Sequence, residues 1–333
     1  VRFVPVHGIG VHRYIEQFEL SLYKAQLIWD VCHKLKAEGF IPDVMCAHPG
    51  WGDSLFLKDV FTSTPLLNYC EFFYKPFGAD VDFDPHGKVA LDTPARIRIK
   101  NVNNLINLDA CDKGVTPTKW QHSVHPKEYQ SKITVLHDGI DTDLLSPRKG
   151  CHFKLPDGTI VHQGDEIITY IARNLEPYRG FPSFMRAMEI LLKDRPECHV
   201  LIIGSDDVSY SRKLPDGKTY KETMLEEVSI DDSRVHFLGY LPYTEMIKVL
   251  LVSKAHVYLT HPFALSWSML EAMALKCLVI GSATAPVEEV IEHGRNGLLV
   301  DFFSPQEIAK TIIDVFEDKN NMQDIREQAR KTI

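Results

Sequence analysis

The sequence lacks the features that would place this chain in several large classes of protein. It has no run of about 18 apolar residues, so we expect no membrane-spanning helix. Its formal net charge is −8, whereas a general nucleic-acid binder usually carries a basic face. The 15 histidines show neither HExxH nor HxxxH spacing, and no GxGxxG follows a predicted strand. Zinc proteases and nicotinamide dehydrogenases are therefore disfavoured.

The seven cysteines do not form the pattern of a disulfide framework. Their number is odd, and no two of them stand at CxxC spacing. Most lie within apolar runs, so we expect buried free thiols, which are typical of a reducing compartment. We therefore expect a cytoplasmic protein, and a peripheral contact with the inner face of the membrane stays compatible with this composition.

The second half of the chain has the clearer alternation of strands and helices. Its 333 residues, 44% of them apolar, are typical of a soluble protein with two domains. Strands are predicted at 167–172, 199–204, 235–238, 255–260, 277–281 and 298–300. Helices are predicted at 182–192, 243–253, 269–275 and 287–292, with two more over 305–333. This alternation predicts an α/β fold with βαβ units and a parallel sheet.

The first half repeats this alternation less cleanly. A helix is predicted at 14–37, and strands at 43–47, 65–70, 112–115 and 132–136. We place the domain boundary near Ser146-Pro147, so the domains are 1–147 and 148–333. The Gly8-Ile9-Gly10 stretch lacks a third spaced glycine and makes a poor phosphate loop. We therefore expect the first domain to lack the opening strand of a Rossmann-like half.

Two segments of the second half have the composition of a diphosphate site. Ala172–Gly180 follows a strand, opens a helix, and carries Arg173 and Arg179 six residues apart. Ligands bind at the carboxyl ends of parallel strands, where arginines and the N–H groups of a helix N-terminus can meet phosphate oxygens. The second segment, Leu265–Ala274, begins another helix with small residues. Its Glu271 could accept hydrogen bonds from ribose hydroxyls, although an ordinary exposed helical carboxylate is the simpler interpretation of that residue alone.

Five segments in the correct order resemble the retaining glycosyltransferases of family four, which have the GT-B fold of two Rossmann-like domains. The matching segments are Val135–Asp141, Ala172–Gly180, Val235–Gly239, Leu270–Ala274 and Glu289–Val300. They resemble, in turn, the family's V-I-x-N-G-I-D junction, its G-R-L…K-G loop, its V-x-F-L-G strand, its L-E-A-M-A helix and its E-V-I…N-G-x-L-V stretch. The resemblance spans about residues 43–300.

The resemblance implies a role for several residues of the second domain. Arg173 matches the arginine that binds the donor phosphate, and Arg179 stands where the family usually has lysine. Glu271 would bind the donor ribose. The remaining donor-binding candidates are the N–H groups around Leu265 and Ser266, with Gly239 and Tyr240 beside the base and Gly204 in the donor cleft. The implied donor is a UDP-sugar, with UDP-glucose preferred.

Two positions depart from the family pattern. The family often shows Glu-x7-Glu, but Phe263 stands eight residues before Glu271. The family also often has a histidine after a strand of its first domain, where this chain has Glu71. Glu71 could orient a sugar hydroxyl or act as a base toward the acceptor, or it could be a salt-bridge residue at the cleft edge.

The segment His48–Asp53 follows the strand predicted at 43–47 and is expected at the same edge of the sheet. His48 is a candidate catalytic residue, with a packing or capping role as the alternative, and Trp51 could stack on a sugar face. Asp80–Asp84 resembles the Asp-x-Asp metal motif of the other major glycosyltransferase fold. Its glycine- and proline-rich surroundings predict a loop, so we expect neither a metal nor another cofactor.

We therefore predict a GT-B glycosyltransferase that moves a hexose from a nucleoside-diphosphate sugar to an acceptor hydroxyl with retention. The acceptor would be a saccharide or a lipid-linked saccharide, in cell-surface polysaccharide or glycoconjugate synthesis. A UDP-sugar 2-epimerase on the same fold is one alternative. Another is a non-catalytic subunit that binds a nucleotide sugar, because Phe263 replaces the usual glutamate.

Overall fold

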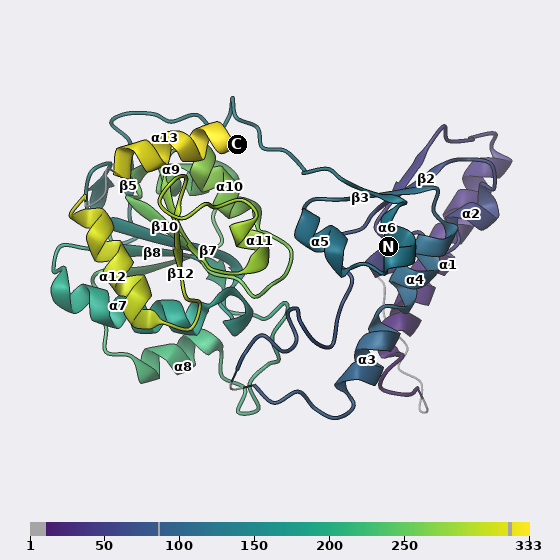
Figure 1. Cartoon of the computed structure of the whole chain (residues 1–333), viewed down its shortest axis with the longest axis horizontal. Helices are drawn as coiled ribbons and strands as arrows, with labels where there is room; N and C mark the ends of the chain where they lie inside the picture. Colours follow the sequence, from purple (N-terminus) through teal and green to yellow (C-terminus); the bar gives the residue numbers. More distant parts are fainter. Residues whose placement is uncertain (1–10, 86, 319–321) are drawn as a thin grey trace. The chain divides into compact units, whose positions relative to one another are not determined.

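The structure is a computed structural model that describes residues 11–85, 87–318 and 322–333 (Figure 1). It divides into two compact units. The first extends to Asp138 and includes Pro262–Ala264, and the second holds Gly139–His261 and the chain from Leu265 onward. The division of roles predicted between residues 1–147 and 148–333 stays a prediction. Gly8-Ile9-Gly10 lies outside the described residues.

The first unit contains a parallel sheet with the strand order β1-β2-β3-β4. Its strands are β1 (Met45–Ala47), β2 (Leu66–Tyr69), β3 (Lys113–Thr116) and β4 (Ile133–Val135). Its helices are α1 (Glu16–Ala37), the 3-10 turn η1 (Pro49–Trp51), α2 (Leu57–Val60), α3 (Thr93–Lys100), α4 (Val102–Ala110), α5 (Lys119–Val124) and α6 (Lys127–Gln130). The four predicted strands and the long first helix are confirmed within a few residues.

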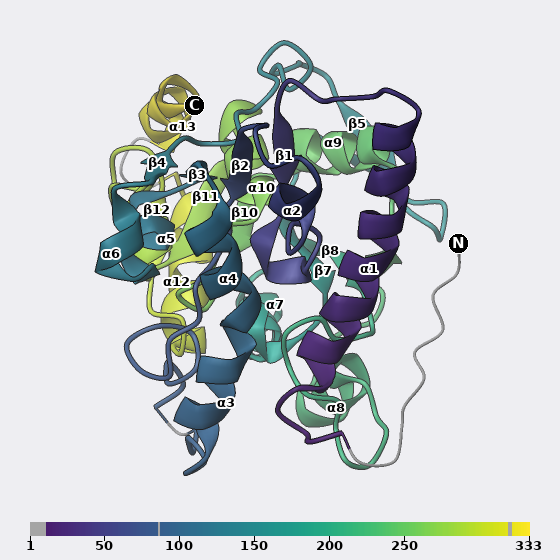
Figure 2. The ribbon, with the colours of Figure 1, turned by 90° about the vertical axis from the view of Figure 1, so that its right-hand side faces the viewer.

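Helix α1 packs only lightly on the rest of the first unit. Figure 2 shows it as a long helix on the face turned toward the viewer. Of its 22 residues, Ser21 and Ala25 are the buried ones. Leu27, Val31 and Leu35 follow one another four residues apart, which places them on one face of the helix, and they are 43%, 58% and 36% exposed. The outer face of α1 is therefore apolar and open.

Helices α3 and α4 were missed by the sequence analysis. Asparagine usually favours turns and helix caps over helix interiors, and α4 contains three asparagines. Here all three are buried and bonded: Asn103 donates to Ser21 Oγ at 2.8 Å, Asn104 to Phe72 O at 3.2 Å, and Asn107 to Pro49 O at 3.1 Å. Long-range partners that sequence patterns do not reveal thus stabilise this helix.

The second unit contains a six-stranded parallel sheet with the order β12-β11-β10-β7-β8-β9. Its strands are β7 (Ile167–Asn174), β8 (His199–Ser205), β9 (Val235–Gly239), β10 (Ala255–Tyr258), β11 (Leu278–Ser282) and β12 (Leu298–Val300). Before them, β5 (His152–Lys154) and β6 (Ile160–His162) form an antiparallel pair. Every strand predicted in this half is present, which confirms the α/β class.

Helices cover both faces of this sheet, as Figure 1 shows for α9, α10 and α13 on one face and α7, α8 and α12 on the other. They are η2 (Pro177–Arg179), α7 (Phe181–Asp194), α8 (Tyr220–Glu227), α9 (Tyr243–Val252), α10 (Trp267–Ala274), α11 (Ala285–Glu288), α12 (Pro305–Phe316) and α13 (Met322–Thr332). The core between them is close to fully buried, as for Ile168, Phe184 and Met269 at 0% exposure. Such burial on both faces is what the continuous apolar strands predict.

The helix predicted at 287–292 is shorter and starts earlier, at Ala285–Glu288. Asn296 causes the difference, because its Oδ1 accepts the N–H of Glu292 at 2.8 Å and its Nδ2 donates to Val290 O at 2.9 Å. These bonds replace the helical ones and turn the chain toward β12.

All seven cysteines are free. Cys70, Cys111, Cys198 and Cys277 are buried as expected, whereas Cys46 is exposed. Among the described residues, no helix combines the length and apolarity needed to cross a membrane.

Candidate active site

Arg173 and Arg179 both lie where β7 ends, but their surroundings differ. Arg173 is exposed, and in the described part of the chain its guanidinium makes no hydrogen bond or ion pair. Arg179 ends η2 and donates through Nη1 to Thr260 Oγ1 at 2.6 Å, with Tyr258 OH 3.4 Å away. Strand β10, which contains Tyr258, is the neighbour of β7 in the sheet. Arg179 therefore ties two adjacent strand ends together, while the side chain of Arg173 is open to a ligand.

The electrostatic surroundings of Arg179 favour its charged form. Burial alone would disfavour the charge, but the nearby Tyr258, Tyr210 and Tyr178 hydroxyls hold the pKa of Arg179 above its ordinary value. The ring of Tyr210 lies against the guanidinium, with 5.5 Å between Cζ and the ring centroid. A fixed, charged guanidinium at the carboxyl edge of a parallel sheet suits the binding of an anion.

Glu271 is a buried residue of α10, so the interpretation as an ordinary exposed helical carboxylate is wrong. Its side chain is 6% exposed and accepts a 2.8 Å hydrogen bond from the Tyr243 hydroxyl of α9. Burial raises the pKa of Glu271 above its usual range, and the bond from Tyr243 acts in the opposite direction. The carboxylate is thus held in one place and keeps acceptor capacity for hydroxyl groups.

The N-terminus of α10 is also tied to β10. The Ser266 N–H donates to Tyr258 OH at 2.7 Å, and the Ser266 and Ser268 hydroxyls lie 3.3 Å apart. One of the N–H groups predicted to hold the diphosphate is therefore already bonded within the protein. Leu265 is half-buried at the start of the same turn.

Two glycines of the predicted donor site are required by the backbone. A Cβ at Gly204, in β8, would lie 2.7 Å from Ala172 O and 2.8 Å from Leu175 Cδ2, so a side chain there would separate the β7 and β8 ends. Gly239 ends β9 with a φ of +62°, in the left-handed region that favours glycine. Tyr240, which follows it, is 89% exposed. Gly204 and Gly239 lie at the carboxyl ends of β8 and β9, and Tyr240 follows β9. Their predicted roles in donor binding stay predictions.

In the first unit, the structure brings His48 and Glu71 together. They follow the neighbouring strands β1 and β2, and His48 Nε2 lies 3.3 Å from Glu71 Oε2. Trp51 stacks on the His48 ring at 4.2 Å and is itself 58% exposed. An imidazole paired with a carboxylate can relay a proton, and the exposed indole offers an apolar face beside the pair.

Gln121 is a residue of this site that the sequence analysis missed. It is 1% exposed in α5, and its Nε2 donates to Glu71 O at 2.6 Å. Thr118, the N-cap of α5, donates to Gln121 Oε1 at 2.9 Å and fixes the amide. One sequence signal could have identified Gln121. Thr118 is a favourable N-cap for a helix that starts just after a strand, at the edge of the sheet where ligands bind.

Phe263 replaces the usual glutamate of the Glu-x7-Glu pattern and is 2% exposed. Within the first unit, its ring meets that of Phe72 edge to face at 4.5 Å. The position is therefore used for aromatic packing.

The Asp80–Asp84 motif lies in a loop, as predicted. The Asp82 carboxylate accepts the N–H groups of Gly78 and Ala79 at 2.9 and 3.3 Å, an arrangement that closes a local turn. Among the described residues, no three His, Cys, Asp or Glu side chains are grouped closely enough to hold a metal ion.

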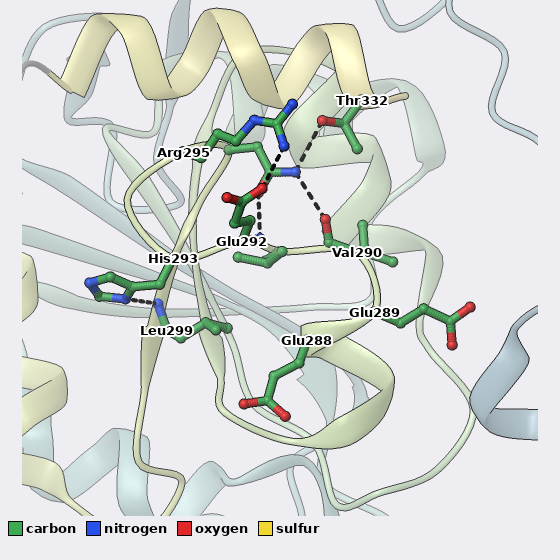
Figure 3. A pocket seen from close by; sticks show the side chains of 10 residues that line it. Glu288, Glu289, Val290, Glu292, His293, Arg295, Leu299 and Thr332 are labelled. Carbon is green, nitrogen blue, oxygen red and sulfur yellow. Dashed lines mark hydrogen bonds and ion pairs between the residues drawn. The ribbon is translucent and has the colours of Figure 1, made fainter.

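A hollow of about 610 Å³ lies in the second unit, apart from every predicted site residue (Figure 3). It is lined by 288–293, Arg295, Asn296, Leu299 and Thr332. Most of its polar groups already have structural partners. Arg295 pairs with Glu292, and Asn296 Nδ2 donates to Thr332 Oγ1 at 3.0 Å. The Glu289–Val300 segment therefore links α13 to the residues that precede β12.

Two family models together match most of the chain. The model described as glycosyl transferase family 4 group matches residues 1–145, and that described as glycosyl transferases group 1 matches residues 158–332. The predicted resemblance is thus confirmed.

Proteins of similar sequence carry related descriptions. The D-inositol 3-phosphate glycosyltransferase of Corynebacterium glutamicum is 26% identical over 192 residues, which are 56% of this chain and 44% of that protein. An uncharacterized glycosyltransferase of Haemophilus influenzae is 22% identical over 214 residues, or 64% of this chain and 54% of that protein. The chain spans about half the length of these relatives.

Solved structures of similar fold cover most of the chain. HepE of Anabaena, in complex with UDP-glucose, has a TM-score of 0.66 and 15% identity over 92% of this chain and 78% of that one. Sucrose-phosphate synthase of Thermosynechococcus elongatus has a TM-score of 0.70 and 15% identity over 98% and 76%. These likenesses confirm the predicted GT-B fold. The model match over residues 158–332, more than half of the chain, shows that the chain belongs to the glycosyl transferases group 1 family.

Proposed function

We propose that this protein is a retaining glycosyltransferase that moves a hexosyl group, preferably glucose, from a UDP-sugar to an acceptor hydroxyl. The main support for this proposal is the contact of Arg179 with Thr260, where the neighbouring strands β7 and β10 end. The buried carboxylate of Glu271 lies on the helix that follows β10. This arrangement lies inside the segment that matches the group 1 family model.

The second unit would bind the donor. When the glycosidic bond breaks, negative charge develops on the departing nucleoside diphosphate, and preorganised cations stabilise that charge. Arg179 supplies a fixed guanidinium and Arg173 an exposed one. Glu271 would accept hydrogen bonds from the ribose hydroxyls, since it is already oriented by Tyr243. The exposed Tyr240 would lie beside the base.

The first unit would bind the acceptor. The His48–Glu71 pair would orient the acceptor hydroxyl and take up its proton as the new glycosidic bond forms. The open face of Trp51 would stack on a sugar ring, which favours a saccharide or a lipid-linked saccharide as the acceptor.

The finer choices rest on relatives and neighbours. The complex of HepE with UDP-glucose supports UDP-glucose as the donor to test first. A role in cell-surface polysaccharide or glycoconjugate synthesis is an analogy with the family. A lipid-linked acceptor would require a peripheral contact with the membrane.

Calorimetric titration of UDP, GDP and ADP into the purified chain, with Arg173→Ala alongside, tests the donor site. We expect UDP to bind in the micromolar range and the variant to bind about tenfold more weakly, because a charge-assisted bond is lost. Release of UDP from UDP-glucose that depends on an added glycoside acceptor then tests transfer. The anomeric configuration of the product, determined by NMR, tests retention. Absence of binding by all three nucleotides would rule out the donor assignment.

One observation favours a second candidate, a non-catalytic subunit that binds a nucleotide sugar. Phe263 fills the place of a glutamate that the family usually sets beside the transferred sugar, and its ring is occupied by packing against Phe72. UDP-glucose binding without turnover across a panel of glycosides and lipid-linked saccharides would support this candidate over the enzyme.

A further inference from the structure

Glu176 is a buried carboxylate in the loop between β7 and η2 that has no role in the mechanism above. It is 1% exposed, and in the described part of the chain no lysine or arginine forms an ion pair with it. Its oxygens accept instead three consecutive backbone N–H groups, from Ser209 at 3.3 Å, Tyr210 at 3.0 Å and Ser211 at 2.7 Å. Successive N–H groups that converge in this way form an anion-binding nest, and here the protein's own carboxylate fills it.

The N–H groups belong to the loop that follows β8, so Glu176 fastens that loop to the end of β7. Asn174 adds to the attachment, because its side-chain amide makes 2.6 Å hydrogen bonds with the hydroxyls of both Ser205 and Ser209. The buried Asn174 and Glu176 thus alternate along the chain with the exposed Arg173 and the buried Leu175. One short segment thus presents an arginine to ligands and fixes the neighbouring loop.

Fastening this loop determines where the side chain of Tyr210 lies. Its ring stacks on that of Tyr178 at 5.0 Å with an interplanar angle of 29°. The Arg179 guanidinium lies over the Tyr210 ring at 5.5 Å, and its Nη1 donates to Thr260. A continuous series of contacts therefore runs from the Glu176 carboxylate, through Tyr210, to Arg179.

We propose that Glu176 is a positioning residue of the donor site, which orders the loop at 206–211 so that Tyr210 holds Arg179 in the orientation that binds the donor diphosphate. This inference rests on the proposed function. Because the N–H groups of Ser209, Tyr210 and Ser211 bond Glu176, they are not available to the donor diphosphate.

The experiment compares Glu176→Gln, Arg179→Ala and the double variant with the wild-type chain. The amide of Glu176→Gln carries no charge and can accept at only one of its two polar atoms, so its bonds to the three N–H groups are weaker than those of the carboxylate. The control is Glu245→Gln, which removes the same charge from an exposed pair with Lys248 on α9. UDP affinity is measured by calorimetry. Loop order is measured by the rate of tryptic cleavage after Arg212 and Lys213, which are exposed and directly follow that loop.

We expect Glu176→Gln to weaken UDP binding about tenfold and to raise the rate of loop cleavage about tenfold, while Glu245→Gln changes neither. The double variant should bind UDP no more weakly than Arg179→Ala, because both changes act through one guanidinium. A merely structural role would instead give additive losses. Tyr210→Leu provides a second test if Glu176→Gln folds poorly. It keeps the nest and should weaken UDP binding to a similar extent.

Unchanged UDP affinity in both Glu176→Gln and Tyr210→Leu would overturn the inference, as would additive losses in the double variant. Failure of the proposed function is recognised separately, since the wild-type chain would then bind no nucleotide at all.

Discussion

The two units contain parallel sheets of the same kind, but they complete the carboxyl edges of those sheets in different ways. In the second unit, the buried Glu176 accepts three backbone N–H groups. Arg179 bonds Thr260, and the buried Glu271 accepts a bond from Tyr243. In the first unit, His48 and Glu71 share a single contact of 3.3 Å, and Trp51 is largely exposed.

This difference matches what each edge is proposed to bind. A nucleoside diphosphate has the same charged centre in every donor, so a rigid, preorganised set of groups serves it well. Acceptors vary in shape, and loops that bind them tolerate more exposure and fewer fixed contacts. The comparison separates two kinds of variant, those that act on donor affinity and those that act on the transfer step.

The largest effect is expected from Glu71→Gln in the first unit. Loss of the carboxylate that pairs with His48 should lower turnover about 10²- to 10⁴-fold, because a general base contributes on that order. UDP affinity should stay within about twofold, since no residue of the predicted donor site is changed. Initial rates with UDP-glucose and calorimetry with UDP measure the two effects.

Glu128→Gln is the matched control, as an exposed glutamate of the same unit. If Glu71→Gln weakened UDP binding as strongly as it lowered turnover, the division of labour between the units would be wrong.

The next effect concerns stability, and Phe184→Ala tests the densely packed core of the second unit. Phe184 is 0% exposed and stacks on Tyr170 at 4.7 Å, so its removal should leave a cavity and cost about 3–5 kcal/mol. Denaturation by urea measures the loss. Phe303→Ala, at a site that is 36% exposed, should cost about 1 kcal/mol or less. Equal losses for the two variants would contradict the picture of a fully packed second unit.

Arg179 variants test whether donor binding needs the particular geometry of arginine. Arg179→Ala should weaken UDP binding about 10- to 100-fold, because a charge-assisted bond is lost. Arg179→Lys should recover only part of the lost affinity. A planar guanidinium can bond Thr260 with one N–H group and a ligand with another, whereas an ammonium lacks this planar arrangement. Arg186→Ala, which breaks the exposed pair with Glu227, should leave the affinity unchanged. Full recovery in Arg179→Lys would show that charge alone matters.

Much of the second unit could be predicted from the sequence because its signals are local. Apolar runs specify β7, β8 and β10, and Arg173 and Arg179 follow a strand directly. The nest around Glu176 could not be predicted, because its N–H donors lie more than 30 residues away and carry no side-chain signal. The bond that holds the Glu271 carboxylate likewise comes from Tyr243, a residue of another helix.

The first unit was harder to predict for a similar reason. Helix α4 is stabilised by asparagines whose partners come from distant segments, as with Asn107 and Pro49. Glu71 and His48 could each be selected from their place after a strand. Their contact was not predicted, because it depends on the register that pairs β1 with β2.

Acid should destabilise both units, through one buried histidine in each. Burial lowers the pKa of His125 and of His256 to about 4, below the ordinary value of 6.5. The unfolded chain therefore binds more protons between pH 6.5 and 4, so stability is complete above that window and falls as the pH drops through it. Each histidine should account for about 2 kcal/mol of the loss between pH 7 and 5.

Urea denaturation at pH 7 and pH 5, for the wild-type chain and for His125→Asn and His256→Asn, measures these contributions. Each variant should lose less stability on acidification than the wild-type chain does. An unchanged pH dependence in His256→Asn would mean that this imidazole does not stay neutral in the folded state.

The smallest effect is expected on the open face of α1, and it tests the other side of the comparison. Val31 is 58% exposed, so Val31→Ser removes little buried apolar area and should change the free energy of unfolding by about 0.5 kcal/mol or less. Ala25→Ser, at a position of α1 that is 1% exposed, is the matched variant and should cost more, because it buries a hydroxyl. Urea denaturation together with sedimentation measures stability and association. A loss of 1 kcal/mol or more in Val31→Ser, or a change in its sedimentation, would mean that another surface covers this face in solution. In that event the first unit is as well packed as the second, and the contrast between the two would be confined to their carboxyl edges.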